Sequence, residues 1–459
     1  MQDLLAVLDV GKTNSKLSIV DVSTGVIVRV IQRVNRAIHA FGMNQLDIEG
    51  LNTWLVTTLA ALPERASISA FVPVGHGAAC ILLGANGELL AAPDYEDPCF
   101  NKIAGVYELL REPYGMTYSP RLPDGQNLGA QLFYLESEQS EVFAATHQIL
   151  LLPQYWAWRL CGVAATEVSS LGAHTDLWLP EHCEYSMMAR SRGWRARMPP
   201  MRAANEVLGS LNSEISQATG MSAECKIFCG AHDSNMSWLS HRNKIEANAS
   251  LTVISSGTWT IAMKGGAKLE CLTASRDMLA NVDVFGSPIA TARFMGGREY
   301  AAIAGDNSAS PTLEDLRHVI SIGAMAWPSF SSAGGPFQGR AGAISGGDGM
   351  SPAERSALAT LYVVLVTEVM LGLLGDSDVV VVDGPLASNR AFSSLLQILC
   401  PTTSVVVSRV SSGATEGARA LVLGDRMRET TNCFSQAEIL PLAGLQQYRN
   451  IWRSSIGMA

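Results

Sequence analysis

The sequence predicts an α/β protein built from two similar halves. Strand-like apolar runs alternate with helical segments along the whole chain, which is the pattern of the α/β class. A hairpin pattern at the start returns about 240 residues later, which suggests an internal duplication. With 459 residues, 47% of them hydrophobic, the chain can bury two cores of ordinary domain size. A polar stretch near 237–250 predicts domains 1–243 and 244–459, with the last helices left free to pack back on the first.

Composition and charge narrow the class of partner. The chain has 42 Asp and Glu residues and 33 Lys and Arg residues, which gives a formal charge of -9. Proteins that bind the phosphate backbone of nucleic acids instead rely on basic patches. We therefore expect no nucleic-acid partner. The first residues, MQDLL, carry no basic segment of a secretion signal. The nine cysteines include no pair at metal or redox spacing, since Cys225 and Cys229 have three residues between them. These features predict a cytoplasmic protein with reduced thiols.

The segment 357–375 needs testing as a membrane span. It is nearly apolar and about as long as a bilayer crossing. Glu368 lies in its second half, and a valine-rich strand begins shortly afterwards at Val379. Because a carboxylate inside a membrane is costly, we expect a buried helix packed on a sheet and no membrane partner.

The first hairpin carries polar residues at its tip. Leu4–Leu8 is an apolar run, Gly11 marks the turn, and 16–20 then alternates as a strand does. The tripeptide Gly11-Lys12-Thr13 is not a Walker A loop, because position 6 holds Ala instead of the glycine that this loop requires. The turn N–H groups and the Thr13 hydroxyl could instead face an anion, with Asp9 placed to hold a metal ion or its water. Asp and Gly are also common in hairpins for turn reasons alone.

A second hairpin offers the matching feature. Apolar residues 251–254 lead into the polar tip Ser255-Ser256-Gly257-Thr258, and 259–263 resumes the strand. Hydroxyl groups and a glycine suit close approach to phosphate. Two such tips facing each other across a cleft would bind a polyphosphate from both sides. The alternative is that any two glycine-turn hairpins look alike.

Asp233 is the candidate catalytic base. It follows the short apolar strand 227–229 in the segment Gly230-Ala231-His232-Asp233-Ser234. A carboxylate at a strand end could take the proton from an attacking hydroxyl in phosphoryl transfer. It could equally cap the helix expected over 234–240. The residues alone leave both interpretations open.

His76 is the candidate substrate-binding histidine. It lies between Gly75 and Gly77, directly after the apolar strand near 70–72. Flanking glycines predict backbone freedom and exposure of the ring. A lone histidine is otherwise more often a structural residue with its ring nitrogens paired.

Further elements place the other motifs. Helices are expected over 50–62, 128–135, 150–160 and 418–423, and strands over 79–83, 379–382 and 405–407. Two of these strands run into turns, at Asp383-Gly384 and before Gly413. A strand that leads into a glycine turn and a helix presents backbone N–H groups to phosphate or a nucleotide.

Taken together and in this order, these segments resemble the FGGY carbohydrate kinases, members of the actin, hexokinase and chaperone-ATPase superfamily. The family's phosphate loop is similar to DVGKTN at 9–14, and its sugar loop to VGHG at 74–77. A third motif is similar to LLPQYWAWRLCG at 151–162. The catalytic motif is similar to GAHD at 230–233, and the last motif to GATEGA at 413–418.

Three positions depart from the family pattern. Lys12 stands where a small hydroxyl residue is usual, and Gln154 stands where Asp is commoner. The nucleotide motif DGPLASN at 383–389 has lost two glycines, so backbone approach to a nucleotide is left at Gly384 only. The segments around His232-Asp233 and 254–259 look most like the rhamnulokinase and fuculokinase branch.

The resemblance implies two duplicated ribonuclease H-like domains of the actin and hexokinase type, with an interdomain cleft that closes over a sugar and MgATP. It implies ATP as donor, Mg²⁺ held through Asp9, and Asp233 as the base. The implied acceptor is a ketose of the L-rhamnulose, L-fuculose or xylulose type, and a homodimer is compatible with it. The implied sugar contacts are His76, Gly77, Gln131 and His232. The implied nucleotide contacts are Gly11, Thr13, Asn14, Gly257, Thr258, Gly384, Asn389, Gly413 and Ala414.

Two alternatives remain at this point. The first is a sensor or chaperone-like nucleotide switch of the same fold, without sugar chemistry, and the presence of Asp233 argues against it. The second is a kinase of another polyol, such as glycerol or gluconate. A few side chains around the acceptor decide between sugars, because each hydroxyl must find a partner.

Overall fold

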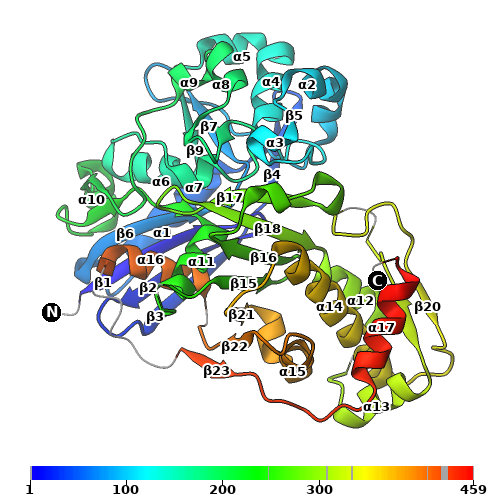
Figure 1. Ribbon diagram of the computed structural model, residues 1–459. Coiled ribbons are helices and arrows are strands. Elements are labelled where there is room, and N and C mark those ends of the chain that lie inside the picture. Colours follow the sequence, from blue (N-terminus) through cyan, green and yellow to red (C-terminus); the bar gives the residue numbers. More distant parts are fainter. Residues whose placement is uncertain are drawn as a thin grey trace. The chain divides into compact units, whose positions relative to one another are not determined.

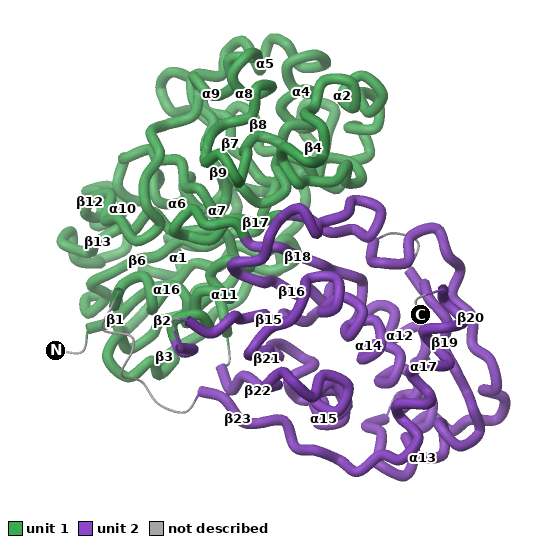
Figure 2. Tube along the Cα trace, viewed as in Figure 1, with its two compact units in different colours: residues 1–243, 280–288, 412–429 green, residues 244–279, 289–411, 430–459 purple. Residues whose placement is uncertain are grey.

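Figure 1 shows a computed structural model of the protein, which describes residues 3–246, 248–306, 309–331, 334–410, 412–424 and 433–457. The chain forms two compact units (Figure 2). Unit 1 comprises Met1–Asn243, Ala280–Pro288 and Ser412–Glu429, and unit 2 comprises Lys244–Leu279, Ile289–Ser411 and Thr430–Ala459. Two segments from the second half of the chain therefore belong to unit 1. The division into domains at residue 243 stays a prediction.

The main sheet of unit 1 is mixed. β1 (Leu4–Val10) and β2 (Asn14–Asp21) form the predicted first hairpin, and β3 (Ile27–Val34) continues it antiparallel. On the other side of β1, β6 (Ile68–Gly75) runs parallel to it. The remaining strands are β14 (Ala231–His232), which pairs with β6, then β13 (Lys226–Phe228) and the edge strand β12 (Val207–Ser210).

Helices cover both faces of this sheet, because successive side chains of a buried strand point to opposite faces. The even-numbered residues of β1 share a core with α1 (Ile48–Ala61), α6 (Leu152–Cys161) and α10 (Ser213–Thr219). Its odd-numbered residues Leu5 and Val7 share a second core with α11 (Asp233–Arg242) and α16 (Gly413–Leu423). Unit 1 is thus a three-layer α/β/α structure, and α16 reaches it from the far end of the sequence (Figure 1).

A smaller sheet and short helices complete unit 1. β7 (Cys80–Leu83) pairs with β8 (Leu89–Ala91) and β9 (Gln148–Leu151). The helix predicted over 150–160 is wrong at its start, because β9 continues to Leu151 and α6 begins only at Leu152. Pro153 occupies the first turn of α6, a place that suits a residue without an N–H. The other elements are β4 (Ala37–Ala40), β5 (Met43–Leu46), α2 (Ala104–Leu110), α3 (Tyr114–Thr117), α4 (Leu128–Glu138), α5 (Ser140–Ala145), α7 (Val168–Leu171), β10 (Trp178–Leu179), β11 (Glu184–Tyr185), α8 (Met187–Ser191) and α9 (Trp194–Arg197).

The sheet of unit 2 repeats the strand order of unit 1. β15 (Leu251–Ser256) and β16 (Thr260–Gly265) form the predicted second hairpin, and β18 (Pro288–Phe294) continues it antiparallel. β21 (Val379–Asp383) runs parallel to β15, as β6 does to β1. The remaining strands are β22 (Ser404–Ser408), β23 (Phe434–Gln436) and β17 (Met278–Val282). The shared order confirms the predicted α/β class and the duplicated hairpins.

The segment tested as a membrane span is the core helix of unit 2, α14 (Pro352–Leu374). It is long and apolar enough to cross a membrane, but 89% of its apolar window is buried inside the protein. Glu368 forms ion pairs with Arg449 at 2.5 Å and with Arg453 at 2.9 Å. Both arginines come from α17 (Leu445–Ser455). The other elements described in unit 2 are η3 (Leu269–Cys271), η4 (Ala274–Arg276), α12 (Gly296–Ala304), α13 (Leu313–Ser321), β19 (Met325–Trp327), β20 (Ala343–Ser345), η5 (Pro385–Ser388) and α15 (Arg390–Leu399).

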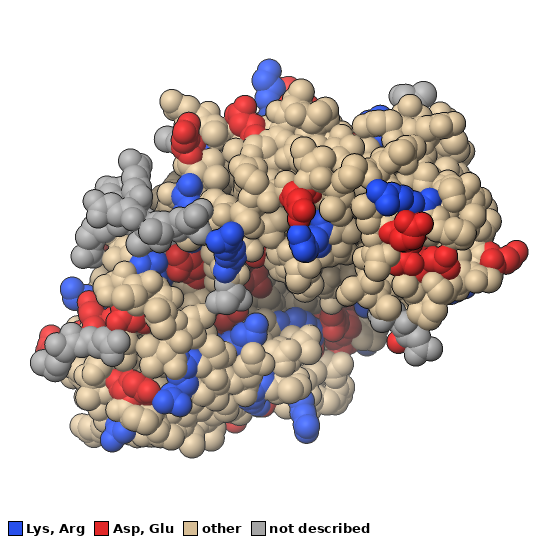
Figure 3. Space-filling view, turned by 90° about the horizontal axis from the view of Figure 1, so that it is seen from below, with Lys and Arg blue, Asp and Glu red and all other residues tan. Residues whose placement is uncertain are grey.

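Charged side chains of both signs are mixed on the surface. On the face in Figure 3, Lys and Arg lie interspersed with Asp and Glu. Pairs such as Arg29 and Glu64, at 2.7 Å, and Arg190 and Glu184, at 2.9 Å, are partly exposed. Exposed pairs of this kind contribute little to stability.

Candidate active site

Four predicted site residues lie where neighbouring strands of unit 1 end. Asp9 is the last but one residue of β1, and His76 directly follows β6, which runs parallel to β1. His232 ends β14, opposite Gly75 of β6, and Asp233 begins α11. Because parallel strands end at one edge of a sheet, residues more than 200 positions apart in the sequence meet here.

Asp233 uses one carboxylate oxygen within its own helix and leaves the other available. Oδ1 accepts hydrogen bonds from the N–H of Ser234 at 2.5 Å and from its hydroxyl at 3.0 Å. The Nε2 atom of His232 lies 3.4 Å from the same oxygen. No residue in the described part of the chain donates a hydrogen bond to Oδ2. The capping interpretation is wrong, because α11 begins at Asp233 and its N-cap position is His232, which makes no side-chain cap bond. Oδ1 bonds only to the adjacent Ser234, while Oδ2 can accept a proton.

His232 is buried and held in one orientation. Its Nδ1 atom accepts a hydrogen bond from the amide Nδ2 of Asn235 at 3.1 Å, so a neutral ring carries its proton on Nε2, toward Asp233. Burial lowers the pKa of His232, and the charge of Asp233 opposes that shift. The ring is thus a neutral donor beside the candidate base.

His76 is buried, with 9% of its surface exposed, so the prediction of an exposed ring is wrong. Its Nδ1 atom donates to the carbonyl oxygen of Gly77 at 2.9 Å, and its pKa is lowered, chiefly by burial. A Cβ atom on Gly77 would lie 2.8 Å from Nε2 of His232 and 3.3 Å from Nε2 of His174. Position 77 needs glycine because the rings of His232 and His174 lie too close to its backbone for a side chain. His76 itself has an ordinary backbone conformation, so the glycines are not there to give it freedom.

His174 and Glu167 are neighbours of the site that sequence reasoning missed. His174 donates from Nδ1 to the carbonyl oxygen of Gln126 at 2.8 Å, which directs Nε2 toward Gly77. Glu167 accepts a hydrogen bond from the Ser169 hydroxyl at 2.8 Å. The oxygen of that Ser169 hydroxyl in turn accepts a hydrogen bond from the backbone N–H of His232 at 3.2 Å. Burial raises the pKa of Glu167 to about 7. No short motif marks these two residues, because Glu167 acts through Ser169 of α7 and His174 is oriented by the backbone of Gln126.

Asp9 has the surroundings of a cation ligand. It lies on the odd-numbered face of β1, the face covered by α11, and no described residue donates a hydrogen bond to its carboxylate. Burial and the charge of Asp233 raise the pKa of Asp9 to about 7, although Lys16 opposes the shift. Within the described ranges no group of three His, Cys, Asp or Glu side chains could hold a metal. A Mg²⁺ ion at Asp9 would therefore need phosphate and water oxygens as its other ligands, which is its usual habit.

The tip of the first hairpin is held rigidly. The N–H of Gly11 donates to the carbonyl oxygen of Asn14 at 3.0 Å, which closes the turn. Asn35, the residue after β3, holds the turn in place, because its Nδ2 donates to the carbonyl oxygen of Gly11 at 2.7 Å and its N–H to that of Thr13 at 2.8 Å. The Thr13 side chain is exposed. The turn can thus present Thr13 to an anion without reorganisation.

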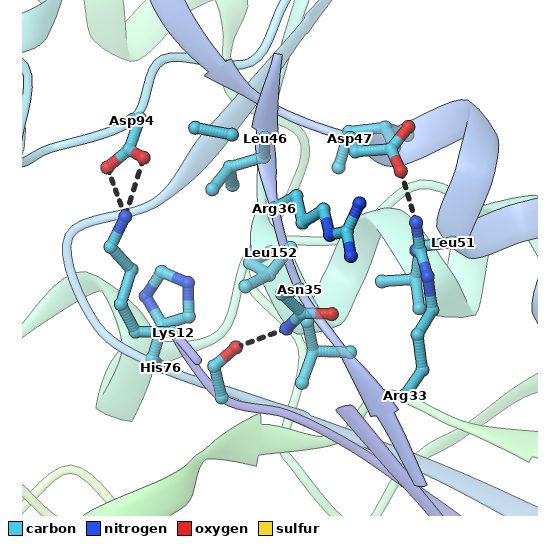
Figure 4. A pocket seen from close by; sticks show the side chains of 14 residues that line it. Lys12, Arg33, Asn35, Arg36, Leu46, Asp47, Leu51, His76, Asp94 and Leu152 are labelled. Atoms are coloured by element: carbon cyan, nitrogen blue, oxygen red, sulfur yellow. Dashed lines mark hydrogen bonds and ion pairs between the residues drawn. The ribbon is translucent and has the colours of Figure 1, made fainter. Parts of the chain in front are cut away.

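Lys12, the unusual residue of this turn, points into a small pocket (Figure 4). Its Nζ atom lies 2.5 Å and 2.6 Å from the two carboxylate oxygens of Asp94, and His76 lies alongside. The pocket measures about 30 Å³ and is lined also by Arg36 and Leu152. A cavity of this size holds water, and it is too small for a sugar.

Gln131 is fully buried and holds the backbone of the loop after His76. Its Nε2 atom donates to the carbonyl oxygens of Ala78 at 2.7 Å and of Gly125 at 2.6 Å, which uses both amide hydrogens. Gln131 thereby fixes the loop that follows His76. Its Oε1 atom is buried and has no hydrogen-bond partner in the described part of the chain, so this oxygen is the part of Gln131 left for a ligand.

The second hairpin tip, in unit 2, carries an unexplained glycine. The backbone of Gly257 is not in the left-handed region, and a Cβ atom there would meet no atom within 4 Å. Neither conformation nor packing requires glycine here, and the open space leaves room for a ligand to approach the backbone. Thr258 beside it is exposed, and its carbonyl oxygen accepts the N–H of Gly297 at 3.2 Å.

Two residues of the altered nucleotide motif have structural partners. Gly384 has φ of 76°, and a Cβ atom there would lie 2.2 Å from the carbonyl oxygen of Ser256. The contact joins the turn after β21 to the end of β15. Asn389 caps α15 by accepting the N–H of Phe392 at 3.1 Å. Both positions are needed for the fold, whatever they bind.

Gly413 and Ala414 begin α16 and lie in unit 1 with Asp233. Ser412 caps this helix through the N–H of Thr415 at 3.4 Å. α16 packs closely on α11, because a Cβ atom on Gly417 would lie only 2.1 Å from the carbonyl oxygen of Met236. The last predicted motif is therefore part of the unit that holds the candidate base.

These features define a class of protein. Two mixed sheets with the same strand order, each opening with a hairpin that has a polar tip, are typical of the two-domain phosphotransferase fold of actin and hexokinase. Family models match residues 124–240, as the N-terminal domain of the FGGY family of carbohydrate kinases, and residues 248–431, as the carbohydrate kinase FGGY C-terminal domain. The chain belongs to the FGGY carbohydrate kinases, which use ATP as phosphate donor.

Solved structures agree with this assignment. A carbohydrate kinase from Novosphingobium aromaticivorans is 33% identical, with a TM-score of 0.91 over 100% of this chain and 99% of that one. A xylulose kinase from Lactobacillus acidophilus (15% identity, TM-score 0.78, 99% of both chains) shares the fold. A Plasmodium falciparum glycerol kinase shares it too (12% identity, TM-score 0.75, 99% of this chain and 98% of that one). No curated protein matches the chain in sequence.

Proposed function

We propose that this carbohydrate kinase transfers the γ-phosphoryl group of ATP to a hydroxyl of a ketose, with Asp233 as the general base. The observation that carries the proposal is the unequal use of the two oxygens of Asp233. Oδ1 is held by Ser234, which fixes the carboxylate, while Oδ2 has no donor in the described chain. A fixed carboxylate with one available oxygen suits removal of a hydroxyl proton during attack on phosphorus.

Each unit contributes its own proposed contacts for the phosphate donor, at the tip of its hairpin. In unit 1 the proposed phosphate contacts are Gly11, Thr13 and Asn14, with the exposed Thr13 hydroxyl as donor, since the N–H of Gly11 is already bonded to Asn14. In unit 2 they are Gly257 and Thr258, and the N–H of Gly257 is already bonded to the carbonyl oxygen of Trp259. Asp9 would hold Mg²⁺, which when bound neutralises phosphate charge. The raised pKa of Asp9 supports this role, because a cation would remove the cost of ionising that carboxylate beside Asp233. Gly384, Asn389, Gly413 and Ala414 remain the proposed contacts for the rest of the nucleotide.

The acceptor site would be formed by the buried histidines. His232 donates from Nε2, and His76, whose Nδ1 is occupied by Gly77, would accept through Nε2. This alternation of donor and acceptor suits a polyol, since every hydroxyl can do both. An L-rhamnulose, L-fuculose or xylulose type of ketose offers enough hydroxyls to satisfy these groups, whereas glycerol would leave some unpaired.

The proposal includes a cytoplasmic enzyme, for which the nine free cysteines are the supporting observation, and it allows a homodimer. The direct test is phosphoryl transfer from MgATP to a panel of ketoses, with glycerol and gluconate included. We expect turnover with one of the ketoses and at least about a hundredfold lower kcat/KM with glycerol. Preference for glycerol or gluconate would overturn the ketose assignment, and transfer to no sugar would overturn the proposed reaction.

A further inference from the structure

Lys12, the unusual residue of the predicted phosphate turn, forms its ion pairs with the segment 94–97, which also contacts the candidate acceptor histidine His76. Lys12 pairs with Asp94 at 2.5 Å, and its Nζ atom also lies 3.4 Å from Glu96. Two carboxylates therefore compensate its charge. A lysine held in this way is poorly placed to neutralise phosphate, although its position in the turn would suggest that role.

The segment that receives Lys12 is itself anchored. Asp94 is buried, its N–H donates to the carbonyl oxygen of Asn44 at 3.0 Å, and its Oδ1 accepts the N–H of Glu96 at 3.0 Å. Asp97 closes the turn, because its N–H donates to the carbonyl oxygen of Asp94 at 3.0 Å. The ion pair thus joins two ordered backbone segments, the phosphate turn and residues 94–97.

Tyr95 connects this ion pair to the candidate acceptor histidine. The Nζ atom of Lys12 lies 5.2 Å from the centre of the Tyr95 ring. The same ring meets the ring of His76 edge to face, with 5.4 Å between centres and 79° between planes. Figure 4 shows Lys12, Asp94 and His76 on the same side of the pocket. Aromatic and cation–π contacts of this geometry restrict how a ring can rotate.

We propose that Lys12 is a positioning residue for the acceptor, which acts through Asp94 and Tyr95 to fix the ring of His76, and is not a ligand of the donor phosphates. The proposal depends on the proposed function in one respect only, namely that the ligand of His76 is the sugar acceptor. It predicts that loss of either partner of the ion pair disturbs His76 in the same way.

The first test needs no substrate. Histidine ring signals are recorded by NMR in protein labelled at Cε1 of histidine, and the His76 signal is assigned with His76→Asn. We expect Lys12→Met and Asp94→Asn each to shift the His76 signal, and the double variant to shift it no further. Arg192→Met is the matched control, because Arg192 also combines an ion pair, to Glu136 at 2.8 Å, with a ring contact, to Phe133 at 4.7 Å. An unmoved His76 signal in both single variants would overturn the proposal.

The second test separates acceptor from donor in the active enzyme. We expect Lys12→Met and Asp94→Asn each to raise KM for the sugar about tenfold, with KM for ATP within about twofold of the wild type. The double variant should match the single variants, and Lys12→Arg should retain most of the wild-type behaviour. A higher KM for ATP in Lys12→Met but not in Asp94→Asn would assign Lys12 to the donor and refute the proposal. An inactive wild type would instead count against the proposed function, while the NMR test still decides this one.

Discussion

Gln154 of α6 holds the backbone of Gly230, three residues before the candidate base. Its Nε2 atom lies 3.2 Å from the carbonyl oxygens of Gly230 and of Cys229. Gly230 has φ of 74°, and a Cβ atom there would lie 1.9 Å from the carbonyl oxygen of Pro73. The amide of Gln154 therefore fixes a tight crossing that leads directly to Asp233.

Replacing that amide should destabilise the protein. Gln154→Glu exchanges a donor for a carboxylate facing two buried carbonyl oxygens, so we expect the free energy of unfolding to fall by about 2–4 kcal/mol. Urea denaturation measures this. Gln139→Glu removes a similar bond, to the carbonyl oxygen of Phe41 at 3.1 Å, at an exposed site, and should cost less than about 1 kcal/mol. Equal losses in both variants would argue against a special role for Gln154.

Asp233→Asn should separate binding from catalysis. Asparagine keeps Oδ1 as acceptor for Ser234 but cannot take a proton, so kcat should fall at least about a hundredfold with little change in sugar binding. Steady-state kinetics and calorimetry of sugar binding measure the two effects. Asp47→Asn is the control, because Asp47 accepts the N–H of Gly50 at the start of α1 in a similar way. Near-normal turnover of Asp233→Asn would remove this residue from the mechanism.

Gly257→Val should weaken MgATP binding with little effect on folding. The protein itself leaves room for the side chain, since no atom lies within 4 Å of the added Cβ, so the obstruction falls on the ligand. We expect the Kd for MgATP to rise at least about tenfold, measured by calorimetry. Gly372 of α14 has equally open space around its Cβ, and Gly372→Val should leave that Kd unchanged. Unaltered MgATP binding by Gly257→Val would contradict a phosphate contact at this tip.

Asp9→Asn should change how stability depends on pH. The pKa of Asp9 is raised to about 7 in the folded protein, against 3.8 for an unperturbed Asp. The folded state therefore binds the proton more tightly, and this contribution is lost as pH rises from about 4 to 7. We expect the advantage of Asp9→Asn over the wild type to grow by about 2–3 kcal/mol between pH 5 and pH 8. Urea denaturation at both pH values measures this difference in unfolding free energy. If the difference is the same at pH 5 and pH 8, the pKa of Asp9 is not raised in the folded protein.

Much of the fold was predictable from local patterns, because strands buried on both faces are continuous apolar runs. The two hairpins and the apolar helix 357–375 follow from such runs and from glycine turns. The start of α6 was misplaced because Leu150 and Leu151 suit a strand as well as a helix. The pairing of β9 with β7 decides between them, and that partner is about 70 residues away in the sequence.

The candidate site was predictable where a motif ends a strand, as at Asp9, His76 and Asp233. It was not predictable where packing alone brings residues in. His174 and Glu167 reach the site through α7 and the chain that follows it, and nothing in their local sequence indicates this. The burial of His76 was missed for a related reason, since glycines on both sides say nothing of the tyrosine that packs against its ring.

Because α16 comes from late in the sequence but belongs to unit 1, it affects when this unit can fold during translation. The core on the α11 side of the main sheet contains Ala414, Ala418 and Leu421, so it cannot be completed until the ribosome has passed α16. When residue 243 emerges, α11 still exposes the surface that Gly417 later covers, and unit 2 must emerge almost entirely before that surface is buried. The candidate base lies at the start of α11. Its final surroundings are therefore assembled only near the end of translation.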